Sequence, residues 1–159
     1  MQDEDYELED QPDNNPDHFD DDSGISFEEQ EFINYCKAND FDCDEDGMDA
    51  DDRKDFVKIK KRFMQAVAEK RLVVDGENVI YTVSKRTPKL AGTEITISRP
   101  NGRTLLAMDG HKDTQQQIKL QNYMAALCRI PRNDIHKITS LDKKDHQIIQ
   151  DIAILFLTE

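Results

Sequence analysis

The sequence predicts an α+β fold, in which helices flank a small antiparallel sheet and an acidic segment precedes the folded body. Apolar residues recur every three or four positions before residue 70 and again after residue 115, a spacing typical of amphipathic helices. Short β-branched runs separated by Gly and Pro turns lie between these regions and indicate strands. Charge is also segregated along the 159 residues, which separates an arm from a body.

The acidic arm is the clearest compositional feature. Residues 1–55 hold 23 acidic and 3 basic side chains, a net charge of −20, whereas the remaining residues carry +7. Residues 1–24 contain too few apolar side chains to offset the entropy lost on ordering. We therefore predict a disordered acidic tail over residues 1–25. Its simplest interpretation is a solubility tail, and contact with the basic body or mimicry of a polyanion is the alternative.

A helix–acidic loop–helix region is predicted over residues 26–70. Ser26 and Glu29 have the spacing of a capping box and place the start of a helix over 26–38, which ends near Asn39. Apolar positions from Phe56 to Ala68 recur at helical spacing and predict a second helix over 53–70.

A small α+β domain is predicted over residues 71–159. Asp75-Gly76 between two β-branched runs indicates a hairpin, and residues 94–98 alternate as a half-buried strand does. A short helix capped near Asn101, or alternatively a fourth strand, comes next. A helix ending before Pro131, one further turn over 134–138 and a last helix capped by Ser140 complete the domain. The last helix has an apolar face too broad for free exposure, so it is core or partly an interface.

Several classes of protein are excluded by what the chain contains. No run approaches the ~20 apolar residues of a membrane span, and the first residues lack the pattern of a secretory signal. Three cysteines without CxxC spacing indicate free thiols in a reducing compartment. Signatures of hydrolases, nucleotide-binding loops and zinc sites are missing from the sequence.

The remaining candidate for catalysis is a cluster at the start of the last helix. Asp142, Asp145 and His146 lie together there, but carboxylates at a helix start are expected from the helix dipole alone. We therefore predict a protein that is not an enzyme. The lysine-rich stretch 54–71 lacks interleaved aromatic residues for base stacking, so nucleic-acid binding is disfavoured.

The acidic loop after the first helix has the opening of an EF-hand. Its candidate calcium ligands are Asp42, Asp44, Asp46 and the carbonyl of Met48. Position twelve of the pattern, where a bidentate Glu closes the site, is Arg53. The alternative is an acidic stretch that matches the pattern through its abundance of Asp, and no cofactor beyond a weakly bound Ca²⁺ is predicted.

A set of mostly apolar positions in the second half of the chain forms a pattern: Ile95-Ile97, Pro100-Gly102, Leu105-Leu106-Met108, Met124-Leu127-Ile130-Pro131, Ile135-Ile138-Leu141, Asp145 and Phe156-Leu157. With this pattern, residues 60–159 resemble the tail-assembly chaperones of long-tailed bacteriophages. The hairpin LVVDGENVIYTV upstream is similar to phage morphogenesis proteins as well. The acidic arm and the calcium-like loop lie outside the resemblance.

The resemblance implies a non-enzymatic binder of the tape-measure protein and of tail-tube subunits. Such a chaperone acts in the cytoplasm of the bacterial host and is absent from the mature virion; oligomerisation and a longer, frameshifted product stay open. Candidate client-binding residues are apolar positions on the last two long helices: Ile149, Ile152, Phe156, Met124 and Leu127. Two alternatives from other classes are a calcium-responsive EF-hand-like module and an acidic decoy that occupies a nucleic-acid-binding partner.

Overall fold

The structure is a computed structural model that describes residues 24–158. It confirms the α+β class. In chain order the elements are α1 (Phe27–Ala38), η1 (Glu45–Gly47), α2 (Ala50–Ala68), β1 (Leu72–Asp75), β2 (Asn78–Thr82), β3 (Glu94–Ile97), α3 (Gly102–Leu106), α4 (Gln116–Leu127), η2 (Arg132–Asp134), α5 (His136–Thr139) and α6 (Lys143–Leu157). The predicted disordered tail falls, up to residue 23, outside the described residues.

The sheet is an antiparallel meander in the order β1-β2-β3. Leu72 pairs with Tyr81, and Tyr81 pairs with Ile95, so these side chains lie on one face. That face is buried, whereas Val73 on the opposite face is exposed. One covered and one solvated face is the usual arrangement for an antiparallel sheet. Gly76 takes a positive φ of 60° in the hairpin turn, as predicted from Asp75-Gly76.

Side-chain caps set most of the helix starts. Ser26 Oγ accepts from the N–H of Glu29 at 3.2 Å and begins α1, as predicted. Asp49 accepts from two backbone N–H groups, so α2 begins three residues before the predicted start. The predicted cap of the last helix was wrong: Asp142, not Ser140, accepts from the N–H of Lys144 at 3.0 Å, because Ser140 Oγ instead donates to the carbonyl of His136.

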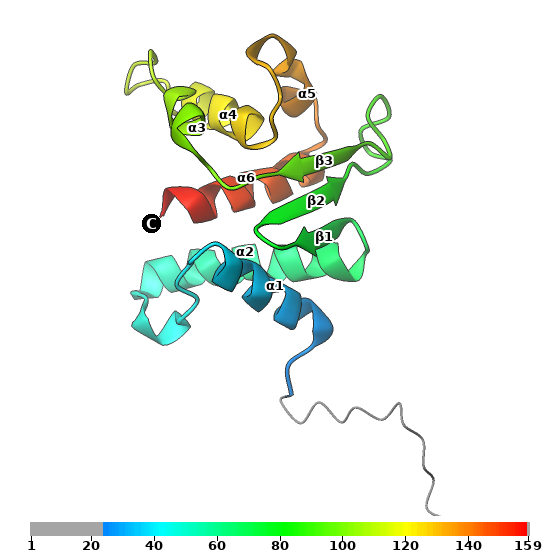
Figure 1. The fold of residues 1–159 in the computed structure, drawn as a ribbon, viewed down its shortest axis with the longest axis vertical. Helices are drawn as coiled ribbons and strands as arrows, with labels where there is room; N and C mark the ends of the chain where they lie inside the picture. The colour runs from blue at the N-terminus through cyan, green and yellow to red at the C-terminus, as the bar shows by residue number, and fades with distance from the viewer. Residues whose placement is uncertain (1–23, 159) are drawn as a thin grey trace, which may run out of the picture.

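One hydrophobic core joins the helix pair to the rest of the chain. In Figure 1, α6 lies between α2 below it and α4 above it, and the strands of the sheet lie at about the same height as α6. Buried side chains from α1, α2, the sheet, α4 and α6 belong to a single cluster. The boundary predicted near residue 70 therefore does not separate two cores. Within residues 24–158, no helix is long and apolar enough to cross a membrane.

Candidate functional site

The last helix does not present the predicted client-binding face to solvent. Ile149, Ile152, Met124 and Leu127 are at most 1% exposed, and Phe156 is half-buried with its ring 4.8 Å from that of Phe41. The breadth of the apolar face of α6 has a simple cause, because α2 and α4 pack against it from two sides. The prediction that these residues form a binding surface is therefore wrong for Ile149, Ile152, Met124 and Leu127, which are core, whereas Phe156 is partly exposed.

Three of the exposed apolar side chains in this half of the chain lie on the contacting helices α3 and α4, whereas Val73 on β1 and Leu157 at the end of α6 are exposed elsewhere. Leu105 is 54% exposed, Leu106 is 64% exposed, and Ile118 on the neighbouring helix α4 is 46% exposed. We call these three residues the α3–α4 surface. Leu105 and Leu106 belong to the positions that carry the phage-chaperone resemblance, whereas Ile118 does not.

A capping box holds α3 in place. Asn101 Oδ1 accepts from the N–H groups of Arg103 and Thr104 at 3.0 and 3.2 Å, and Thr104 Oγ1 accepts from the N–H of Asn101 at 3.1 Å. Thr104 is buried, so it orients this five-residue helix from within. The short helix expected after Asn101 is therefore confirmed over the alternative fourth strand, and its leucines lie on the outer side.

Asp145 lies at the centre of a buried polar group. Its carboxylate accepts from Tyr81 Oη at 2.6 Å, from Ser84 N and Oγ at 3.1 and 2.9 Å, and from Thr87 Oγ1 at 2.9 Å. Burial alone raises the pKa of Asp145, but these hydrogen bonds outweigh it and lower the pKa. Asp145 thus ties the start of α6 to the segment after β2, a role that follows from partners about 60 residues earlier in the chain.

The side chains of the other two members of the suspected catalytic cluster have different partners, although the backbone N–H of Asp142 donates to Thr87 Oγ1 at 2.7 Å. His146 lies with Nε2 2.9 Å from Gln121 Oε1 on α4, and burial lowers its pKa. Asp142 caps α6. Asp145 therefore contacts the segment after β2 and His146 contacts α4, and no hydrogen bond joins these two side chains among the described contacts.

The calcium-like loop is folded around hydrogen bonds of its own. Asp42 Oδ1 accepts from the N–H of Asp44 at 2.9 Å, and Asp44 Oδ1 accepts from the N–H of Asp46 at 3.1 Å. Arg53 Nε donates to the carbonyl of Glu45 at 2.7 Å, and its Nη2 is 3.3 Å from Asp46 Oδ1. Among the described residues, the guanidinium that replaces the closing Glu contacts this loop, and so does Lys60, whose Nζ lies 3.2 Å from Glu45 Oε1.

Metal binding at this loop stays a prediction. Met48, the expected carbonyl ligand, is half-buried and packs against the core. Across residues 24–158, no three His, Cys, Asp or Glu side chains are grouped to hold a metal ion. A bound Ca²⁺ would have to displace Arg53 and rearrange the carboxylates that now cap backbone N–H groups.

All three cysteines are free thiols, as the sequence predicts. Burial raises the pKa of Cys128 to about 12. The hydrogen bond between Cys36 and Cys43 raises the pKa of the former and lowers that of the latter. Cys43 is consequently the thiol with the greatest tendency to ionise.

Comparisons of the chain with protein-family models, with curated proteins and with solved structures find no match.

Proposed function

We propose that this protein is a tail-assembly chaperone of a long-tailed bacteriophage, which binds the tape-measure protein and tail-tube subunits during virion morphogenesis. In this role it acts in the cytoplasm of the bacterial host, performs no catalysis, and is absent from the finished particle. The proposal rests on the resemblance over residues 60–159 and on how the matching residues are used in the fold.

The observation that carries the proposal is the exposure of Leu105 and Leu106. Most matching positions serve the fold: Ile95, Ile97 and Asp145 are buried. The two leucines are more than half exposed instead, on a short helix that the capping box fixes in orientation. Apolar side chains held outward on a rigid element favour contact with another chain.

A helical client with an apolar stripe fits this surface. Burying a fully exposed leucine side chain contributes about 1.5–3 kcal/mol. Because Leu105 and Leu106 are 54% and 64% exposed, together they contribute roughly 2–3.5 kcal/mol, which is on the order of a hundredfold in affinity. The α3–α4 surface thereby replaces the face of α6 as the proposed client site, since α6 is occupied by α2 and α4.

Co-expression with the long, helix-rich tape-measure chain tests the proposal. The wild type is expected to co-purify with that chain and to raise its soluble fraction. Leu105→Asp with Leu106→Asp should abolish the capture without changing the melting temperature. The matched control is Val57→Asp with Val73→Asp, which adds the same charge at two exposed apolar positions on α2 and β1 and should retain capture.

Two results would overturn different parts of the proposal. Equal capture by both double variants would remove the α3–α4 surface as the client site. Failure of the folded wild type to bind either the tape-measure chain or the tail-tube subunit would remove the chaperone function itself.

A further inference from the structure

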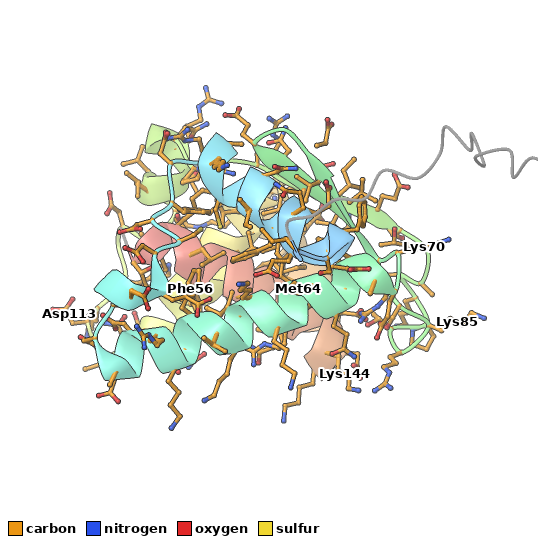
Figure 2. The ribbon with its side chains drawn as sticks, turned by 90° about the horizontal axis from the view of Figure 1, so that it is seen from below. Phe56, Met64, Lys70, Lys85, Asp113 and Lys144 are labelled. Atoms are coloured by element: carbon orange, nitrogen blue, oxygen red, sulfur yellow. The ribbon has the colours of Figure 1, made fainter. Side chains whose placement is uncertain are left out.

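A basic cleft lies between α2, the segment after β2 and the start of α6. It has a volume of about 590 Å³. Its lining includes six cationic side chains and one carboxylate, that of Glu69; the cations are Arg62, Arg71, Lys85, Arg86, Lys143 and Lys144. In Figure 2, Lys85 and Lys144 lie at the same end of the molecule as Lys70, and Asp113 lies at the opposite end.

Two of the six cations are neutralised from within the fold. Arg62 Nη2 lies 2.8 Å from Asp151 Oδ1, and Arg71 Nε lies 2.7 Å from Glu69 Oε2. Glu69, the one carboxylate that the described residues place on the lining, is therefore already paired with Arg71.

The other four cations form a set that we call the free cations: Lys85, Arg86, Lys143 and Lys144. Within the described part of the chain, no ion pair satisfies any of them. The cleft therefore keeps an excess of positive charge.

The placement of two free cations works against local electrostatics. Lys143 and Lys144 lie in the first turn of α6, where the helix dipole is positive and favours anions. Lys85 and Arg86 face the same cleft from the segment after β2. Like charges gathered around one hollow repel each other, and an anionic group in the hollow relieves that repulsion.

The chain carries a matching anionic segment. Residues 1–23 contain eleven Asp and Glu side chains and no Lys or Arg. The described chain begins just before α1, where Glu29 lies 2.8 Å from Lys60 of α2. Along α2, Lys60 and Glu69 at the cleft are separated by about 14 Å. Since 23 residues can span up to roughly 75 Å, a segment of this length is long enough to reach the cleft of its own chain.

We propose that the acidic segment 1–23 binds the basic cleft of its own chain. Its carboxylates supply the counter-charges that the free cations lack. A covalent tether of this length gives a high effective concentration, on the order of millimolar, which favours this occupant over a free polyanion. The inference is independent of the proposed chaperone function.

Zero-length cross-linking of the full chain by a carbodiimide tests this contact, because the reagent joins only touching carboxylates and amines. Mass spectrometry is expected to find residues 1–23 linked to Lys85, Lys143 and Lys144 within monomers. Raising the NaCl concentration to about 0.5 M should suppress these links, since the Debye length falls to a few ångströms. Links spread evenly over remote lysines such as Lys112 and Lys137 would overturn the proposal.

Cross-linking a mixture of isotope-labelled and unlabelled protein distinguishes links within one chain from links between two chains. Links from labelled segment to unlabelled cleft would assign the occupant to a second copy and overturn binding in the same chain. Binding of a short DNA duplex in the cleft of the full chain at low salt would also overturn it, because the cleft would then be open.

Charge-reversal variants locate the site. Lys85→Glu with Lys144→Glu should lower the yield of links to Lys143 roughly tenfold, as expected when attraction becomes repulsion at the rim. Arg103→Glu with Arg132→Glu makes the same change of charge in a separate basic groove beside α3 and should leave that yield unchanged. Equal loss in both variants would show that only net charge matters and would overturn the assignment to this cleft.

Discussion

Replacing Asp145 by Asn removes the charge of a carboxylate that accepts more hydrogen bonds than any other in residues 24–158, while keeping the side-chain volume. Asp145 is 0% exposed and accepts four hydrogen bonds from Tyr81, Ser84 and Thr87. A hydrogen bond to a charged group contributes about 1.5–3 kcal/mol and a neutral one about 0.5–1.5 kcal/mol. The asparagine oxygen can keep two bonds as neutral ones, but its NH₂ group faces two hydroxyls that now donate. We expect the free energy of unfolding to fall by about 3 kcal/mol, which corresponds to a decrease of roughly 6–12 °C in melting temperature.

The pH dependence provides a second test of the same reasoning. The pKa of Asp145 is lowered in the folded protein, so its ionised form stabilises the fold above the ordinary carboxyl pKa of about 3.9. That contribution is lost as the pH falls through the folded-state pKa. In urea denaturation, the free energies of unfolding of wild type and Asp145→Asn should therefore differ most at pH 7. The difference should become smaller as the pH is made more acidic.

A matched control is Asp113→Asn, the same change at a fully exposed side chain paired with Lys119, which should leave the stability unchanged. The reasoning is refuted if Asp145→Asn costs less than about 1 kcal/mol at pH 7, or if its cost does not depend on pH.

Three further predictions concern other parts of the fold. Arg62→Met leaves the buried Asp151 without its cation. Because Arg62 is itself partly exposed, we expect the free energy of unfolding measured in urea to fall by about 2 kcal/mol. An unchanged midpoint would contradict a stabilising ion pair. Lys70 follows α2 with φ of 58°, so Lys70→Gly should raise the stability by about 1 kcal/mol, and a lower melting temperature would argue against that backbone strain. Iodoacetamide should alkylate Cys43, which is half-buried and has a lowered pKa, well before the buried Cys128 in folded protein; equal rates by mass spectrometry would contradict this order.

The secondary structure could be predicted largely from local sequence because its signals are local. Ser26 with Glu29, and Asn101 before α3, place helix starts through bonds made within three residues. Asp75-Gly76 specifies the hairpin for the same reason. Errors arose where two local candidates competed: Ser140 and Asp142 both suit a cap, and only the packing of α5 decides that Ser140 bonds backward to His136.

The candidate site could not be predicted in the same way. A broad apolar face has the same pattern whether one helix or two helices cover it. Periodicity therefore could not show that α2 and α4 together bury Ile149 and Ile152. Nor could it show that Leu105 and Leu106 stay exposed, because exposure depends on which elements pack beside α3.

The sequence by itself determined the acidic arm, the basic body, the order of helices and strands, and the residues that carry the resemblance, since composition and short-range bonding need no fold to be expressed. The tertiary structure alone decided which apolar residues are core and which are surface. It also decided that Asp145 meets Ser84 and Thr87 and that Arg53 contacts the acidic loop. In the same way it brought into one cleft four cations that form no ion pair with any described residue. These outcomes depend on contacts between residues distant in the chain, which arise only when the elements pack around a common core.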